Sequence, residues 1–245
     1  MNTKEKIIEL ITEEVKNNNS NGFFREPIVG FSSAKDELFK HLKQIVGEHH
    51  ILPEDILPEA ETVVSFFIPF SEALVESNKG KEVSREWAQS YVECNILINN
   101  VCTKLVEALT ASGIKAGAVK ATGGYDEKTL VAAWSHRSAA YIAGLGMFGQ
   151  NRILITKKGG AGRYGSIVIS EVIQPDARTG EEHCFFHQGK YCRYCMNKCP
   201  VGALAEEGFD RHKCNKQLMS AECDFPDLKS KCCGKCVVGP CAIIS

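Results

Sequence analysis

The 245-residue sequence is long enough to bury a substantial core in one or two domains, since 44% of its residues are hydrophobic and 24% are charged. This composition excludes an intrinsically disordered chain. The formal net charge of -1 provides no overall basic field of the kind that draws proteins to nucleic acid or to an anionic membrane.

The first eleven residues mix charged and apolar side chains at helical spacing, unlike the continuous apolar core of a signal peptide. No apolar run approaches the length of a membrane span. We therefore expect a cytoplasmic protein with no membrane partner. In that reducing compartment the twelve cysteines are expected to be metal ligands or core residues rather than disulfides.

Apolar spacing predicts the elements of the first half of the chain. Amphipathic helices are expected over residues 3–17 and 35–46, and a buried strand over residues 62–68. Residues 84–111 have apolar side chains at three- and four-residue steps, the pattern of a long helix packed on a core. That pattern favours Cys94 and Cys102 as buried small hydrophobic residues rather than ligands.

Shorter elements follow. We expect a strand over residues 116–120 and a helix over residues 135–143. Two β-branched runs, 153–156 and 166–173, read as a hairpin joined by the glycine-rich loop 157–165. Because helices and strands are mixed without regular alternation, the fold class expected for this part of the chain is α+β.

Residues 144–149 and 160–165 both match the G-x-G-x-x-G spacing of dinucleotide sites. Neither segment follows a strand and opens a helix, which is the arrangement that directs a helix N-terminus at the phosphates. These glycines are instead expected to allow close approach of the backbone, either to packing neighbours or to a flat ligand.

Ten of the twelve cysteines lie between Cys184 and Cys241. The spacing Cys192-x2-Cys195-x3-Cys199-Pro200 is typical of bacterial ferredoxins, in which the cysteine before proline binds the other of two clusters. Pro200 is expected to begin a short helix that extends to residue 204, since its missing N–H would be unpaired there. A polar, turn-forming stretch at residues 175–180 separates these cysteines from the body.

The crossed ligation rule assigns eight cysteines to two 4Fe-4S clusters. Cluster one takes Cys184, Cys192, Cys195 and Cys241, and cluster two takes Cys199, Cys214, Cys233 and Cys236. Cys223 and Cys232 are left over, and a one-residue slip would let Cys232 replace Cys233.

Zinc is the alternative metal, because paired Cys-x2-Cys sequences also form four-cysteine zinc sites. Zinc ribbons need neither the Cys-x3-Cys-Pro ending nor eight reciprocally spaced thiols, which favours iron-sulfur clusters. The expected organisation is a mixed α/β N-terminal domain over residues 1–175 and a ferredoxin-like double 4Fe-4S cluster domain over residues 176–245.

The segment WSHRSAAYIAGLGMFGQN at residues 134–151, the runs within residues 153–173 and the cysteine-rich tail together resemble epoxyqueuosine reductases and their shorter relatives, which are related to reductive dehalogenases. The resemblance implies an oxidoreductase whose clusters pass electrons to base-off cobalamin held by the N-terminal domain. It implies that the glycines of the two segments line the corrin ring, namely Gly144, Gly146, Gly149, Gly160 and Gly162.

His136 and Arg137 are the candidate catalytic residues, with helix capping or ion pairing as the alternative role. As a catalyst, His136 would supply a proton or a hydrogen bond to the substrate. The family's proposed proton donor is an aspartate a few residues before the arginine that corresponds to Arg137, whereas residues 130–133 here are Leu-Val-Ala-Ala. Asp126, Glu127 and His136 are the nearby groups able to replace it.

The expected partners are an external electron donor, such as a ferredoxin or flavodoxin, and a small-molecule or protein-bound corrinoid substrate. Two alternatives stay open: an electron carrier whose N-terminal domain only docks a partner, and a truncated tRNA epoxyqueuosine reductase. The related enzymes grip tRNA with a helical-repeat domain beyond the clusters, and this sequence ends four residues after Cys241. That difference and the near-neutral charge argue against tRNA as a partner.

Overall fold

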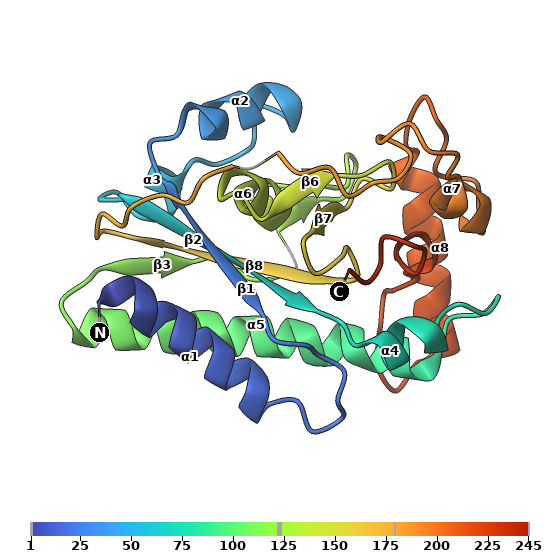
Figure 1. The fold of residues 1–245 in the computed structure, drawn as a ribbon, viewed down its shortest axis with the longest axis horizontal. Helices are drawn as coiled ribbons and strands as arrows, with labels where there is room; N and C mark the ends of the chain where they lie inside the picture. The colour runs from blue at the N-terminus through green and yellow to red at the C-terminus, as the bar shows by residue number, and fades with distance from the viewer. Residues whose placement is uncertain (1, 122–123, 179, 245) are drawn as a thin grey trace.

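The computed structural model describes residues 2–121, 124–178 and 180–244. Figure 1 shows a central sheet with helices on both faces and the cysteine-rich segment at one end. The helices are α1 (Thr3–Asn17), α2 (Glu37–Ile45), α3 (Pro53–Ile56), α4 (Glu72–Ser77), α5 (Arg85–Ala111), α6 (His136–Ile142), α7 (Tyr194–Lys198), α8 (Arg211–Asp224) and the 3-10 helix η1 (Lys235–Val237). The strands are β1 (Ile28–Ser33), β2 (Thr62–Pro69), β3 (Ala116–Ala118), β4 (Tyr125–Asp126), β5 (Val131–Ala132), β6 (Gly146–Phe148), β7 (Leu154–Thr156) and β8 (Gly162–Ile169).

The main sheet has four antiparallel strands in the order β1-β2-β8-β3. Every residue of β2 is buried, because the strand is central and both faces of the sheet are covered. Its alternate side chains enter two cores: Val64 and Phe66 pack with α1 and α5, whereas Val63 packs with α2, α3 and α6. The expected α+β fold is confirmed.

Helix starts follow the sequence closely. The side chain of Asn2 forms a capping box at the start of α1, and Ser84 and Ser135 cap α5 and α6. Cys94 and Cys102 are 0% and 4% exposed on the inner face of α5. Burial raises the pKa of each thiol to about 12, which confirms that they are core side chains and not ligands.

The expected hairpin between residues 153–156 and 166–173 is wrong. Strand β7 pairs with β6 in a separate two-stranded sheet, whereas β8 begins at Gly162 and pairs with β2 and β3. Gly146 permits the β6–β7 pairing, because a Cβ there would lie 2.1 Å from the carbonyl oxygen of Ile155. Strand β8, which was expected to pair with β7 in a hairpin, therefore belongs to the central sheet. The spacing of apolar residues does not reveal which strands pair.

The helix expected after Pro200 is also absent. The short helix α7 precedes Cys199, and the chain after Pro200 turns instead of continuing as a helix. Gly202 has a φ of +58°, and the backbone N–H of Ala203 donates to Cys199 Sγ at 3.1 Å. In a helix this N–H group would instead donate to a backbone carbonyl oxygen of the preceding turn.

The cysteine-rich segment packs directly on the body. Cys232, Val238 and Ala242 belong to the same core as the inner face of α5. Within the part of the chain that the structure describes, no helix combines the length and the apolarity required to cross a membrane, α5 included.

Candidate metal centre

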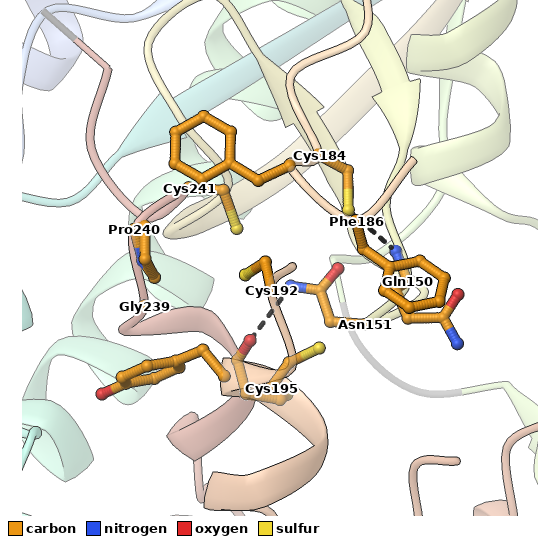
Figure 2. Close-up of a pocket in the computed structure, with 12 residues that line it drawn as sticks. Gln150, Asn151, Cys184, Phe186, Cys192, Cys195, Gly239, Pro240 and Cys241 are labelled. Carbon is orange, nitrogen blue, oxygen red and sulfur yellow. Dashed lines mark hydrogen bonds between the residues drawn. The ribbon is translucent and has the colours of Figure 1, made fainter. Parts of the chain in front are cut away.

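The first cysteine set, Cys184, Cys192, Cys195 and Cys241, lines one pocket at the edge of the body. Figure 2 shows the four cysteines around this pocket, where Cys192 and Cys195 from one stretch of the chain lie near Cys184 and Cys241. Cys241 lies in the C-terminal segment and joins three cysteines that precede α8, as crossed ligation requires.

The pKa shifts within the first set agree with the closeness of its four thiols in the pocket. Burial, followed by the nearby Cys184, Cys195 and Cys192, raises the pKa of Cys241 to about 12. Burial also raises the pKa of Cys195, again with contributions from Cys184 and Cys192. Thiols that disfavour each other's ionisation at such close range need a cation to become thiolates together.

The second cysteine set is Cys199, Cys214, Cys233 and Cys236. Burial, followed by Cys233 and Cys199, raises the pKa of Cys214 to about 11. Burial, followed by Cys233 and Cys214, also raises the pKa of Cys236, which is half-buried. Cys195 of the first set acts on Cys236 as well, so the two sets lie next to each other.

Cys233 rather than Cys232 faces the second set. Cys233 interacts electrostatically with Cys199, and the backbone N–H of Lys235 donates to its sulfur. Cys232 is 3% exposed, belongs to the main core and accepts a hydrogen bond from Ser230 Oγ at 3.2 Å. The side chain of the other spare cysteine, Cys223, lies outside the described residues.

Gln150 and Asn151 tie the body to both cysteine sets, a role that sequence reasoning missed. Both are nearly buried, at 6% and 5% exposure. The backbone N–H of Gln150 donates to Cys184 Sγ at 3.5 Å, and Asn151 Nδ2 donates to the carbonyl oxygen of Cys236 at 3.0 Å (Figure 2). In the sequence, only their position at the end of the AGLGMFGQN segment pointed to this role.

The glycines assigned to a corrin ring all have protein neighbours. A Cβ on Gly144 would lie 2.6 Å from the carbonyl oxygen of Ala177, and one on Gly162 would lie 2.4 Å from that of Ile68. A Cβ on Gly149 would clash with the side chain of Ile155, and one on Gly146 would clash with the backbone of Ile155. A Cβ on Gly160 would make only ordinary van der Waals contacts. Close packing within the protein accounts for most of these glycines, and contact with a corrin ring stays a prediction.

His136 belongs to a hydrogen-bonded group at the sheet. Its Nδ1 lies 2.7 Å from Ser166 Oγ and its Nε2 lies 3.2 Å from the carbonyl oxygen of Lys120. Because a carbonyl only accepts, Nε2 carries the proton and Nδ1 accepts from the Ser166 hydroxyl. Trp134 Nε1 donates to the same hydroxyl oxygen at 2.9 Å, and burial lowers the pKa of His136, so the ring is held neutral.

Replacing Ser166 with alanine is expected to destabilise the protein by about 2 kcal/mol, because it leaves Trp134 Nε1 and His136 Nδ1 without their shared partner. The measurement is chemical denaturation at neutral pH. Ser112→Ala is the control, since that exposed hydroxyl only donates to the carbonyl oxygen of Ala108. Equal stability of the two variants would show that the Ser166 group contributes nothing.

Arg137, at the start of α6, has an exposed side chain and donates to the carbonyl oxygen of Arg152 at 2.9 Å. It lies within electrostatic reach of Cys236 and Cys214 but pairs with no carboxylate among the described residues. The second cysteine set is therefore the one adjacent to Arg137. Arg163, also nearby, has a buried Nε with no hydrogen-bond partner in the described part of the chain.

Strands β4 and β5 form a small hairpin at the stretch where related enzymes carry their aspartate. Asp126 Oδ1 accepts hydrogen bonds from the backbone N–H of Lys128 and from both N–H and Oγ1 of Thr129. These bonds lower the pKa of Asp126, with that from the Thr129 backbone contributing most, so its carboxylate stabilises the turn as an anion. Such a group is poorly suited to donate a proton at neutral pH.

Leu130 ends this turn with a φ of +55°, a left-handed conformation that costs a residue with a Cβ about 1–2 kcal/mol. Leu130→Gly is expected to stabilise the protein by about 1 kcal/mol through removal of that strain. Leu130→Ala is the matched control because alanine keeps the Cβ. Thermal unfolding of the two variants checks this, and a glycine variant no more stable than the alanine variant would contradict it.

Comparison with known proteins gives sequence relatives and a shared fold. No protein-family model matches the chain. Curated epoxyqueuosine reductases match it at 24% identity over 197 residues in Listeria monocytogenes, covering 79% of this chain, and at 25% over 223 residues in Bacillus cereus, covering 81%. These matches cover 49% and 54% of the relatives, so the chain spans about half the length of the curated relatives it matches.

Solved structures share the arrangement of elements. Epoxyqueuosine reductase from Streptococcus thermophilus superposes with a TM-score of 0.60 at 18% identity, covering 98% of this chain and 66% of that protein. A catabolic reductive dehalogenase superposes with a TM-score of 0.57 at 16% identity, covering 85% of this chain and 28% of that one. The resemblance expected from the sequence motifs is thus confirmed: the chain is similar to epoxyqueuosine reductases in sequence and in fold, and a reductive dehalogenase shares that fold.

Proposed function

We propose that the protein is an iron-sulfur oxidoreductase in which two 4Fe-4S clusters relay electrons to a corrinoid for a reductive reaction. The observation that carries the proposal is the gathering of eight cysteines close together in the fold, which fits the crossed pattern of two-cluster ferredoxins. The curated relatives, which are reductases by name, support the enzyme class.

The donor sets fit iron-sulfur clusters. Each set offers four buried or half-buried thiols, the ligands that such clusters require, and each receives N–H···S hydrogen bonds from the backbone. A cluster of this kind supplies one-electron transfer without bond changes in the protein. The chain's own contribution is to shield the sulfurs from water and to hold the two sets side by side. The electrostatic interaction between Cys195 of the first set and Cys236 of the second indicates that the sets are close.

A ligand beside Arg137 is supported by polar atoms that lack partners. Arg163 Nε and Asn95 Oδ1 are buried, and neither has a hydrogen-bond partner among the described residues. Buried polar atoms of this kind are rare in folded proteins unless something else completes their hydrogen bonds. The phosphate of a corrinoid would accept a hydrogen bond from Arg163 Nε, which lies within electrostatic reach of Arg137.

In this proposal Arg137 contacts the bound corrinoid or the substrate, since its side chain is exposed and lacks a carboxylate partner. For His136 to act directly, its Nε2–H would have to leave the Lys120 carbonyl and donate to the substrate instead. The cobalamin that would be held here supplies reductive chemistry at its metal. One protein that shares the fold is a reductive dehalogenase whose structure suggests a mechanism for B12-dependent dehalogenation by that protein.

We also propose that a reduced ferredoxin or flavodoxin delivers electrons at the first cysteine set. Cys192 lines a surface pocket together with Lys190, Tyr191 and Arg193. Tyr191 is 93% exposed beside this predicted ligand. Lys190 provides positive charge beside this exposed ring that complements an acidic donor surface, whereas Arg193 is paired with Glu206.

The test is anaerobic purification, followed by titration with cobalamin monitored by absorption spectroscopy. The expected result is saturable binding that Arg163→Gln weakens at least tenfold. The alternative, an electron carrier that only docks a partner, predicts cluster absorption with no corrinoid affinity. That outcome would remove the corrinoid from the proposal.

A further inference from the structure

Lys235 is a buried lysine placed between two predicted ligands of the second set, in the sequence Cys233-Gly-Lys-Cys236. Only 3% of the residue is exposed, although lysine is among the residues least often buried. Its Nζ donates to the Asn78 carbonyl oxygen at 2.8 Å, to Asn78 Oδ1 at 2.9 Å and to the Glu82 carbonyl oxygen at 2.6 Å. Three acceptors require three N–H groups, so Lys235 is held as an ammonium ion.

None of these three acceptors is charged. Within the described ranges, Lys235 forms no ion pair with a carboxylate. Burying a cation among neutral dipoles alone is unfavourable, so an anionic group is expected close by. The predicted ligands Cys233 and Cys236 lie two residues before Lys235 and one residue after it, so a cluster bound by them would supply such an anionic group.

Rigid contacts fix the ammonium group relative to the sulfurs. Asn78, which is fully buried, also donates from Nδ2 to the carbonyl oxygen of Cys233 at 2.9 Å. Gly234 has a φ of +73°, and a Cβ there would lie 2.2 Å from the ring of Trp87. The loop is therefore clamped between Asn78 and Trp87, and the distance between the charge of Lys235 and the second set cannot relax.

We propose that Lys235 is a positioning residue of the second cluster, whose fixed positive charge raises that cluster's reduction potential. The inference rests on the proposed function, because the second set must hold a 4Fe-4S cluster. On reduction the cluster accepts one electron from the protein donor and becomes more negative by one unit, with no bond made or broken. A buried cation nearby favours that more negative state, and little salt screening reaches it.

The test is a redox titration of both clusters in anaerobic protein, followed by electron paramagnetic resonance. Lys235→Gln keeps an N–H donor for Asn78 and removes the charge. The equilibrium constant for reducing the second cluster is expected to fall about tenfold, a shift of about 59 mV for one electron, while the first cluster is unchanged. Lys198→Gln is the matched control: this lysine precedes the ligand Cys199 but is exposed, so its charge is screened.

Asn78→Asp is a second variant, which adds a carboxylate beside Lys235 and keeps the size of the side chain; because it also removes the donor to the Cys233 carbonyl oxygen, its iron content is measured first. It is expected to lower the same potential. Two intact clusters with unchanged potentials in both variants would overturn the role of Lys235 and leave the proposed function standing. Loss of any iron-sulfur signal from the second set in the unmutated protein would instead overturn the proposed function.

Discussion

Replacing Cys241 with serine is expected to remove the same cluster as replacing Cys192, although α8 and all four cysteines of the second set lie between them in sequence. Both residues belong to the first set, and their thiols interact in the fold. Each variant should lose about half of its iron, roughly four atoms of eight, and the double variant should lose no more than either single one. Replacing Cys214 should remove the other signal.

Iron and sulfide analysis and electron paramagnetic resonance of anaerobic protein measure this. Cys232→Ser is the control, because Cys232 faces the core and Ser230 rather than the second set. A loss of iron in Cys232→Ser, with none in Cys233→Ser, would show that the ligand is shifted by one residue. Loss of different clusters from the Cys192 and Cys241 variants would refute the crossed pairing.

Gly159→Ala is expected to destabilise the protein by about 3 kcal/mol, since strain in the left-handed region adds to a steric clash. Gly159 has a φ of +100°, and a Cβ there would lie 2.1 Å from the carbonyl oxygen of Ala242. The same turn holds the C-terminal segment through Gly160 N–H, which donates to the Cys241 carbonyl oxygen at 2.9 Å. The substitution should therefore displace Cys241 as well.

Thermal unfolding and iron content check this prediction. The variant is expected to unfold at lower temperature and to lose iron from the first set before the second. Gly80→Ala is the control, because nothing lies within 4 Å of a Cβ at Gly80 and its φ is not in the left-handed region. If Gly159→Ala matched Gly80→Ala in both measurements, the turn would not hold Cys241 in place.

Local signals in the sequence predicted several helices of the body but missed the 14-residue helix α8. Apolar spacing placed α1, α5 and α6 within a residue or two, and Asn2, Ser84 and Ser135 cap these helices in the structure. The cysteine sets were also predictable, because ligand spacing follows from the shape of a cluster rather than from the rest of the fold.

Pairings between distant segments were not predictable. Strand β1 escaped notice because Gly30 interrupts a short apolar run, yet a Cβ there would lie 2.7 Å from the carbonyl oxygen of Ala143. The partners of β7 and β8 depend on close approaches at Gly146 and Gly162 that only the folded chain reveals. The position of Lys235 between two predicted ligands could be read from the sequence. Its burial could not, because it depends on a contact with Asn78, which is far away in sequence.

The most direct measurement is the quantity of iron, acid-labile sulfide and zinc in protein purified without oxygen. Two clusters predict about eight iron atoms and eight sulfides per chain, with no stoichiometric zinc. Zinc bound by the same thiols, with no labile sulfide, would contradict the electron relay and everything proposed from it.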